Sequence, residues 1–288
     1  MVLRPGVDAG LTVHDALLAA PVLAGVTTAQ LQAQWLDGDV VDVDGRPVDL
    51  EAPVLRPIPV YVYRGLPDEP AVPFDLPILH RDADLVVVDK PHFLATMPRG
   101  RHVRETALVR LRRELGNDHL APAHRLDRLT AGVLLFTAAP GVRSAYQGLF
   151  ADRSVRKEYR ALAPADEALR TTVRVTDRIE KTAGDLRARV VPGEPNAISD
   201  ITLESVRDDG LGVYRLVPLT GRTHQLRLHM AALGVPIVGD PLYPEVDPDL
   251  AAAPDRGDYS SPLRLVAASL EFDDPFTGRP RRFTSRRS

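Results

Sequence analysis

The stretch from His124 to Thr137, HRLDRLTAGVLLFT, constrains the fold more than any other part of the sequence. Its second half contains a continuous apolar run, Val133 to Phe136, which is typical of a strand buried on both faces. Its first half carries more charge than a turn needs. A charged loop at the end of a buried strand is a place where proteins hold reactive groups, because the strand fixes the position while the loop stays accessible. Asp127 is therefore a candidate reactive carboxylate, but the stretch taken alone favours an ion pair with a neighbouring arginine, so the rest of the chain must decide between the two.

The composition limits the chemistry that the chain can perform. It has no cysteine, which excludes disulfides, thiolate nucleophiles, iron–sulfur clusters and zinc sites that need sulfur. Any catalysis must use oxygen and nitrogen groups. No apolar run reaches the roughly 18 residues that cross a bilayer, and the sequence does not begin like a signal peptide. We therefore expect a cytoplasmic protein that makes no membrane contact.

Charge is spread unevenly along the chain. Residues 1–79 hold 4 basic and 11 acidic residues, a net charge of −7, whereas the remainder holds 32 basic and 28 acidic residues, a net charge of +4. Arginine accounts for 33 of the 36 basic residues, and its side chain suits bidentate phosphate contacts and stacking on bases. A genome-wide codon bias is the simpler explanation for most of them. The body of the chain is mildly basic and its N-terminal part is acidic.

A proline-rich segment predicts two domains. Residues 66–77 contain four prolines and no periodicity, which indicates an extended connector. Before it, residues 1–65 predict a small α/β unit, with a helix capped at Thr27 and closed by Gly38 and a short hairpin over 39–50. After it, residues 78–288 form the larger domain. There the periodicity predicts strands over 85–89, 133–136, 155–164, 171–179, 201–206 and 214–219, helices over 103–115, 140–150 and 220–233, and a final hairpin over 264–283.

Three further clusters concentrate functional side chains. Each has a structural explanation when taken alone, because tyrosines fill cores and polar residues cap helices. The clusters are Lys90-Pro91 with the following His92, Arg99, Arg101 and His102; Lys157 and Tyr159 on one strand face; and Arg222, Thr223, His224, Gln225, Arg227 and His229 around a helix start.

Taken together, the four segments resemble the RluA-type family of RNA pseudouridine synthases. That family carries a KPxG-like strand end, HRLDxxTSG, KxYxA and GRTHQIRxHLAxLGxPIxGDxLY in this order, and here they read KPHF, HRLDRLTAG, KEYRA and GRTHQLRLHMAALGVPIVGDPLY. The resemblance spans roughly residues 80 to 285. It implies an α+β pseudouridine synthase fold, in which a mixed but largely antiparallel sheet is flanked by helices and loops.

The resemblance also implies an isomerase that converts specific uridines of ribosomal or transfer RNA to pseudouridine. The base is cut from C1′ of its ribose, rotated and rejoined through C5, and neither a cofactor nor a metal is implied. The motifs give Asp127 as the catalytic aspartate, Tyr159 as the active-site tyrosine and Arg227 as the partner of Asp127. Arg125 matches the position expected to enter the helix as the base leaves.

These residue types suit the reaction. Asp127 must be ionised, and Arg227 would supply a permanent opposite charge. Tyr159 offers a flat face on which a flipped uracil can stack, and a hydroxyl near the C5 proton. We expect a monomer that binds RNA through further residues around the site: His124, Arg125, Thr130, Lys157, Arg222, His224, Gln225 and Lys90.

The sequence departs from the family pattern in places. Ala131 replaces the serine of TSG, and KPHF lacks the loop glycine. The N-terminal unit has the general outline of an S4-type RNA-binding module without its basic face. Its negative charge opposes phosphate binding, so we expect a degenerate S4-like module that serves stability or protein contacts.

Two alternatives remain open at this point. One is a non-catalytic RNA-binding pseudoenzyme on the same fold, against which the intact Asp127, Tyr159 and Arg227 argue. The other is a metal-dependent hydrolase that uses His224, His229 and Asp240. Its two histidines are five positions apart, so they cannot share a helical face as ligands at i and i+4 do.

Overall fold

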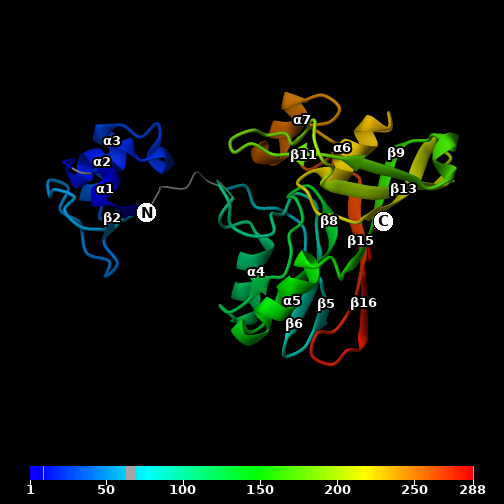
Figure 1. Cartoon of the computed structure of the whole chain (residues 1–288), viewed down its shortest axis with the longest axis horizontal. Coiled ribbons are helices and arrows are strands. Elements are labelled where there is room, and N and C mark those ends of the chain that lie inside the picture. The colour runs from blue at the N-terminus through cyan, green and yellow to red at the C-terminus, as the bar shows by residue number, and fades with distance from the viewer. Residues whose placement is uncertain (9, 63–68, 101, 288) are drawn as a thin grey trace. The chain divides into compact units, whose positions relative to one another are not determined.

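The structure, a computed structural model, describes residues 1–8, 10–62, 69–100 and 102–287. The chain divides into two compact units, residues 1–67 and 68–288 (Figure 1). Residues 66–68 of the expected connector lie outside the described residues. Its later residues belong to the larger unit, because Val72 and Leu76 are buried in that unit's core. Segment 69–77 is therefore part of the larger fold and not a free linker.

The smaller unit has its own hydrophobic core. The expected helix is present, and Thr27 caps it with a capping box that Gln30 completes. The expected hairpin over 39–50 forms only in part. Val41 makes an isolated β-bridge to Pro47, but Val40 and Val41 pair as a strand with residues 61–62. The unit contains β1 (Val2–Leu3), α1 (Pro5–Asp8), α2 (Val13–Ala19), a 3-10 helix (Pro21–Leu23), α3 (Thr28–Leu36), β2 (Val40–Val41), β3 (Ile58–Pro59) and β4 (Tyr61–Val62).

The larger unit is built on one sheet of ten strands. Its strands are β5 (Ile78–Arg81), β6 (Leu85–Lys90), β7 (Ala121–Pro122), β8 (Ala131–Thr137), β9 (Arg156–Pro164), β10 (Val173–Asp177), β13 (Ala197–Val206), β14 (Leu211–Pro218), β15 (Leu265–Asp273) and β16 (Pro280–Thr284), while β11 (Ile179–Glu180) and β12 (Arg189–Val190) form a separate small ladder. Its helices are α4 (Ala107–Leu115), α5 (Arg143–Ala151), α6 (Gln225–Ala232) and α7 (Pro248–Ala252), with 3-10 turns at Pro140–Val142, Glu167–Arg170 and Ala253–Arg256.

The strand order is β10-β13-β14-β9-β15-β8-β6-β5, with β16 paired to β15 and β7 paired to β8. Among the described strands of this sheet, only β8 and β15 pair in parallel. The helices flank the sheet (Figure 1). The mixed, mostly antiparallel α+β fold that the resemblance implied is confirmed. No helix in the described part of the chain is long and apolar enough to cross a membrane.

The predicted buried strand is β8, and every one of its residues is buried. Gly132 lies in it with φ +111°, opposite Ala267 of β15. A Cβ at Gly132 would lie 2.2 Å from the carbonyl oxygen of Ala267. The glycine of the TAG sequence is therefore required, because β8 and β15 approach each other too closely for any side chain.

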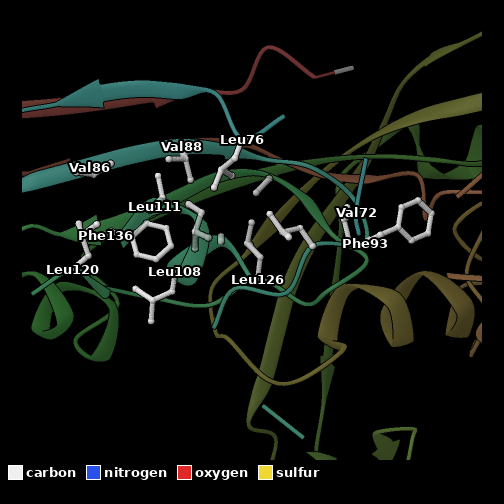
Figure 2. Packing of buried hydrophobic residues seen from close by; sticks show 14 residues of the cluster. Val72, Leu76, Val86, Val88, Phe93, Leu108, Leu111, Leu120, Leu126 and Phe136 are labelled. Carbon is white, nitrogen blue, oxygen red and sulfur yellow. The ribbon is translucent and has the colours of Figure 1, made fainter. Parts of the chain in front are cut away.

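One core cluster lies between β6, β8 and α4, and it fixes the start of the Asp127 loop (Figure 2). Leu126 is buried in this cluster, whereas the preceding Arg125 is exposed. The Thr96 hydroxyl donates to the Leu126 carbonyl at 2.8 Å and accepts from the Leu126 N–H at 3.1 Å. A buried leucine and two hydrogen bonds therefore hold the residue that precedes Asp127.

The first turn expected for the helix over 103–115 is absent. Helix α4 begins at Ala107, and Thr106 is its cap, because the Thr106 hydroxyl accepts from the Val109 N–H at 3.2 Å. The N–H groups of residues 103–105 instead donate to the Glu69 carboxylate. A carboxylate from the segment before β5 therefore binds the N–H groups of the residues that precede the helix.

Candidate active site

A cleft of about 810 Å³ lies beside the loop that precedes β8. Its walls come from that loop, the end of α5, β9 and the loop that leads into α6. Ten of the eleven predicted site residues line it, and Lys90 does not. The ten are His124, Arg125, Asp127, Thr130, Lys157, Tyr159, Arg222, His224, Gln225 and Arg227.

Asp127 presents a carboxylate that accepts no hydrogen bond from any described residue. It is half-buried. Its backbone is fixed on both sides, because Leu126 is buried before it and the Thr130 N–H donates to the Asp127 carbonyl at 3.1 Å. The simple ion pair with its neighbour is not formed, since Arg128 pairs with Asp255 at 3.3 Å. The carboxylate is therefore positioned by the backbone and stays available to a ligand.

Tyr159 lies on β9, the strand next to β15, and packs against two core clusters. Its hydroxyl makes no hydrogen bond within the described part of the chain. Burial raises the pKa of the Tyr159 hydroxyl well above its usual value, and the nearby charge of Asp127 raises this pKa further. The phenol is therefore neutral at neutral pH, with its polar end in the cleft beside Asp127.

Arg227 pairs with a different carboxylate from the one expected. Its Nε and Nη2 donate to Asp240 at 2.7 and 2.6 Å, and no hydrogen bond joins it to Asp127. Burial disfavours its charge, but the hydrogen bonds and charge of Asp240, followed by the charge of Asp127, raise the pKa of Arg227 above its ordinary value. Arg227 therefore hydrogen-bonds to Asp240 and interacts with Asp127 through space, and its expected role as the opposite charge for Asp127 stays a prediction.

His224 begins α6 in a left-handed conformation, with φ +58°. Its Nδ1 lies 2.9 Å from the Tyr243 hydroxyl. Burial lowers the pKa of His224 to about 4, although the charge of Asp127 opposes this effect. The imidazole is therefore neutral at neutral pH, and it can offer RNA a hydrogen bond but no charge.

Two residues expected to contact RNA have hydrogen-bond partners inside the protein. The Gln225 amide oxygen accepts from Thr220 and from the Arg222 N–H, and its nitrogen donates to Ile198 and Ser199. All four hydrogen-bonding positions of this amide are thus in use. Gln225 orders the loop before α6 and has no free group for a base.

The His124 ring is likewise committed to the protein. Its Nε2 accepts from the Leu135 N–H at 3.2 Å, and the ring stacks on Phe150 with centroids 4.3 Å apart. Burial lowers the pKa of His124 to about 3, and the charge of Lys157 lowers it further. We expected a direct RNA contact here, and the structure shows a neutral ring that packs in the cleft wall.

Lys90 is fully buried at the end of β6. Its ammonium donates to the carbonyl oxygens of Pro91, Leu94 and Arg128. Burial lowers the pKa of Lys90 to about 7, whereas the charge of Asp127 raises it. The expected RNA contact is therefore corrected, because two of the hydrogen bonds go to the loop after β6 and the third goes to the Asp127 loop.

The cleft is strongly cationic. Among the described residues that line it, Asp127 is the only acid. Lys157 donates to the Thr220 carbonyl at 3.2 Å, and burial, together with the charge of Arg153, lowers its pKa. Thr130 also lines the cleft and is buried. The cations that line the cleft are Arg125, Arg153, Lys157, Arg222 and Arg227, and such a surface suits a polyanion.

Sequence reasoning assigned no active-site role in the synthase interpretation to three residues near the cleft, although it named Asp240 as a ligand in the metal-hydrolase alternative. Asp240 and Tyr243 lie in GDPLY, part of the last motif, which offered a signal for both. Arg153 belongs to no motif, and it follows α5 with φ +59°. The predicted Arg101 lies outside the described residues.

The metal-hydrolase alternative finds no supporting geometry. Within the described ranges, no three His, Asp or Glu side chains gather closely enough to hold a metal ion. Asp240 is bound to Arg227, and the buried His229 has its Nε2 3.6 Å from Asp177.

Comparisons with known proteins point to one family. The RNA pseudouridylate synthase family model matches residues 84–232. RNA pseudouridine synthase 5 of Arabidopsis thaliana is 30% identical over 275 residues, which cover 81% of this chain and 74% of that protein. The dual-specificity RNA pseudouridine synthase RluA of Pasteurella multocida is 30% identical over 216 residues, covering 70% and 89%. The structure of human RNA pseudouridylate synthase domain containing 1 superposes with a TM-score of 0.56 at 26% identity, covering 76% of this chain and 86% of that one.

Proposed function

Since the chain belongs to the RluA-type family of RNA pseudouridine synthases and converts uridine in RNA to pseudouridine, we propose that Asp127, Tyr159 and Arg227 perform this isomerisation in the cleft beside β8. The observation that carries the proposal is the pair of unpartnered groups, the Asp127 carboxylate and the Tyr159 hydroxyl, that share a cleft with five cations. Polar groups this close to a core normally have partners. These two are left available for a substrate.

Asp127 is the reactive group in this proposal. Isomerisation breaks the bond between N1 of uracil and C1′ of ribose, turns the base and joins C5 to C1′; C5 then loses its proton and N1 gains one. An ionised carboxylate with free oxygens can attack, or can stabilise the electron-poor ribose while the base is detached. The atoms of substrate and product are the same, so the reaction needs no oxidant and no second substrate.

Tyr159 and the cations would handle the flipped nucleotide. The Tyr159 ring offers a flat surface to uracil, and its neutral hydroxyl can donate a hydrogen bond beside Asp127. Flipping a base from a helix costs a few kcal/mol of lost stacking. Arg125 is exposed at the rim, where it can fill the vacated position, and Lys157, Arg153 and Arg222 can hold the flanking phosphates.

The substrate and setting are further proposals. We infer that the substrate is ribosomal or transfer RNA, that no metal takes part and that the protein acts as a cytoplasmic monomer. A relative whose name is dual-specificity RNA pseudouridine synthase supports an RNA substrate. Mapping pseudouridine across total RNA from cells with and without the gene would identify the uridine, and sedimentation of the pure protein would give its oligomeric state. Activity retained in a chelator would support catalysis without a metal.

The direct test is Asp127→Asn. This substitution keeps the shape of the side chain and removes its charge, so we expect no detectable pseudouridine while the dissociation constant for RNA stays within several-fold. The exposed Asp118→Asn is the matched control and should behave like the wild type. Turnover by the Asp127 variant would contradict the assignment.

The same experiment separates the enzyme from a pseudoenzyme that only binds RNA. If the wild-type protein binds uridine-containing RNA tightly but yields no pseudouridine with any RNA, the pseudoenzyme is correct. Family membership and the free Asp127 carboxylate both favour the enzyme.

A further inference from the structure

Three described residues other than glycine have a left-handed backbone, and two of them line the cleft. Their φ angles are +58° for His224, +59° for Arg153 and +67° for Phe93. Bulky side chains disfavour this conformation, and a strained backbone persists only where the surrounding structure holds it in place. Phe93 is the one of the three that does not line the cleft. Its conformation therefore needs an explanation other than direct contact with a substrate.

Phe93 occupies the place of a glycine in the family pattern. The pattern is KPxG, and this chain reads KPHF from Lys90 to Phe93. Glycine adopts a positive φ without strain, whereas here phenylalanine adopts it. The turn brings the carbonyl oxygens of Pro91 and Leu94 to one ammonium, that of Lys90, at 3.0 and 2.7 Å. The loop after β6 therefore makes a tight turn without the glycine.

The packing of the Phe93 ring holds this turn in place. The residue is 4% exposed and belongs to the core cluster between β6, β8 and α4 (Figure 2). Its ring centroid lies 5.2 Å from that of Tyr259 and 6.3 Å from that of Phe74. Aromatic rings at such distances attract each other beyond the burial of their surface. Because Phe74 precedes β5 and Tyr259 follows α7, the ring joins three distant segments of the larger unit.

His92, the neighbour of Phe93, reaches the Asp127 loop, residues 124–130. Its Nδ1 lies 2.8 Å from the carbonyl oxygen of Leu129. A carbonyl oxygen can only accept, so Nδ1 carries the proton and donates. Burial lowers the pKa of His92 to about 4, although the hydrogen bond to Leu129 opposes this effect. The imidazole is therefore neutral at neutral pH, and its single proton is used on the Leu129 carbonyl.

Three consecutive carbonyl groups fix the Asp127 loop, and the KPHF segment binds two of them. The Asp127 carbonyl accepts from the Thr130 N–H, the Arg128 carbonyl from Lys90 and the Leu129 carbonyl from His92. The Asp127 carboxylate accepts no hydrogen bond from any described residue, so the backbone of the loop alone decides where it lies. A change that releases the Leu129 carbonyl should let the carboxylate move.

We propose that His92 is a positioning residue, which holds the Leu129 carbonyl and so fixes the Asp127 carboxylate for the reacting nucleotide, and that the Phe93 ring holds the turn from which His92 reaches this carbonyl. Phenylalanine at this place supplies an aromatic anchor, which a glycine does not have. This inference rests on the proposed function, because it assigns His92 a task in catalysis only if Asp127 reacts.

His92→Leu and His92→Asn test the proposal as a pair. Leucine fills the space but cannot donate, whereas the amide nitrogen of asparagine takes the position of Nδ1 and can donate to the Leu129 carbonyl. A misplacement of about 1 Å at a reacting centre can cost about 100-fold in rate. We expect the single-turnover rate at saturating RNA to fall by about 10- to 100-fold in His92→Leu and to stay within about threefold of the wild type in His92→Asn. The dissociation constant for RNA should change by less than about threefold in both.

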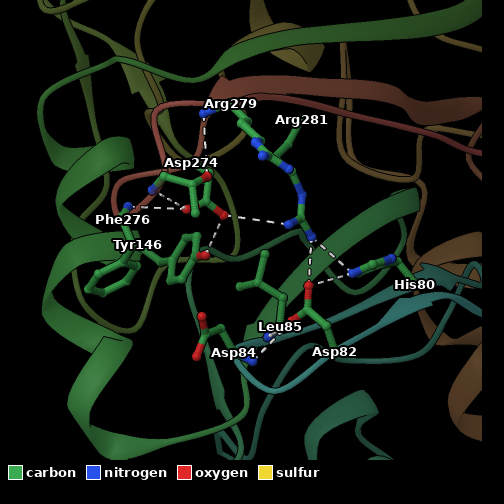
Figure 3. Close-up of polar contacts among 10 residues, drawn as sticks. His80, Asp82, Asp84, Leu85, Tyr146, Asp274, Phe276, Arg279 and Arg281 are labelled. Atoms are coloured by element: carbon green, nitrogen blue, oxygen red, sulfur yellow. Dashed lines mark hydrogen bonds and ion pairs between the residues drawn. The ribbon is translucent and has the colours of Figure 1, made fainter.

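The matched control is His80→Leu. His80 is half-buried in the same unit, and its ring also makes hydrogen bonds, at 2.7 Å to Asp82 and 2.9 Å to Arg281 (Figure 3). It does not line the cleft. This variant should lose stability but keep the wild-type single-turnover rate below its unfolding temperature. A wild-type rate for His92→Leu, or an equal rate loss in His92→Leu and His92→Asn, would overturn the proposal.

A double-mutant cycle tests whether Phe93 acts through His92. Phe93→Gly removes the ring and relaxes the backbone, so we expect the rate to fall by about tenfold. In that background His92→Leu should lower the rate by less than about threefold more, because the histidine is no longer held in place. Rate losses that multiply in full would refute the role of Phe93. The two His92 variants decide the proposal if Phe93→Gly does not fold, and a wild-type protein that makes no pseudouridine would instead refute the proposed function.

Discussion

At the scale of single residues, a close backbone contact at Gly132 fixes the strands beside the candidate active site. Gly132 lies five residues after Asp127, where β8 meets β15, and its φ of +111° lies in a region that side chains disfavour. The next strand, β9, carries Tyr159 and pairs with β15 through the same residue, Ala267. Gly132 therefore sets the spacing between β8, which follows Asp127, and β15, which pairs with the strand that carries Tyr159.

Gly132→Ala should be strongly destabilising. The new Cβ would overlap the Ala267 carbonyl oxygen at 2.2 Å, so β8 and β15 must separate, at a cost of about 3 kcal/mol or more. Urea unfolding measures the change, and the isomerisation rate should fall with it. Gly148→Ala is the control: Gly148 lies in α5 with no atom near the new Cβ, and alanine there should stabilise by about 0.5–1 kcal/mol. Similar stabilities for the two variants would contradict this explanation.

The sequence predicted which residues line the site better than it predicted which of them bind each other. The motifs named Asp127, Tyr159 and Arg227, and the structure brings all three to one cleft. The sequence paired Arg227 with Asp127, whereas Asp240 binds it. Which of two carboxylates binds a guanidinium depends on how the turn that carries Asp240 packs against the rest of the fold, and the motif names the residues of that turn but not their contacts.

At the scale of elements, most strands and helices follow from periodicity, and the errors arise where distant groups intervene. Strands β6, β8, β9, β10, β13 and β14 and the β15–β16 hairpin lie where alternation or apolar runs predict them. The start of α4 was predicted four residues early, because Glu69, more than 30 positions away, binds the N–H groups of residues 103–105. Sequence patterns describe local preference, and a long-range carboxylate overrides it.

The β15–β16 hairpin is joined to α5 and β5 by a polar network (Figure 3). Burial alone would raise the pKa of Asp274, but hydrogen bonds from the Tyr146 hydroxyl and from the N–H groups of Phe276 and Thr277 outweigh it and lower this pKa. A carboxyl group whose pKa is lowered by folding stabilises the folded state at pH values above its pKa in the unfolded state, about 3.8. That stabilisation is lost as the pH falls through the pKa of this group in the folded state.

We therefore expect the free energy of unfolding to decrease as the pH is lowered from about 5 to about 2, with a shallower decrease for Asp274→Asn. At pH 7 that variant should be about 1–3 kcal/mol less stable than the wild type, because its amide cannot replace the charged hydrogen bonds. Urea unfolding at a series of pH values tests both statements. An unchanged slope below pH 4 would show that other carboxyl groups dominate acid unfolding.

At the scale of the whole molecule, the most acidic part of the chain and the candidate active site lie in different units. The core of the smaller unit lies within residues 1–62 and the cleft lies wholly within the larger unit. Residues 1–79 carry a net charge of −7. The degenerate S4-like role remains a proposal, and the division of the chain makes it testable by deletion.

A fragment that begins at residue 68 should fold and keep an isomerisation rate within about threefold of the full chain, because it retains every residue of the cleft. Its RNA affinity should be equal or higher, since an acidic unit that repels phosphate is gone. Filter binding at two salt concentrations and a single-turnover assay measure both quantities. A tenfold weaker affinity would show that the smaller unit binds RNA despite its charge.

The position of β15 also decides when the enzyme can first exist during its synthesis. This strand comes from residues 265–273, yet it lies between β8 and β9, which end more than 100 residues earlier. A nascent chain that has not yet reached residue 265 presents both neighbours with unpaired edges, which are sites of mispairing between chains. Until β15 enters the gap, β8 and β9 are not joined in one sheet, so we expect an unfinished chain to be unable to modify RNA.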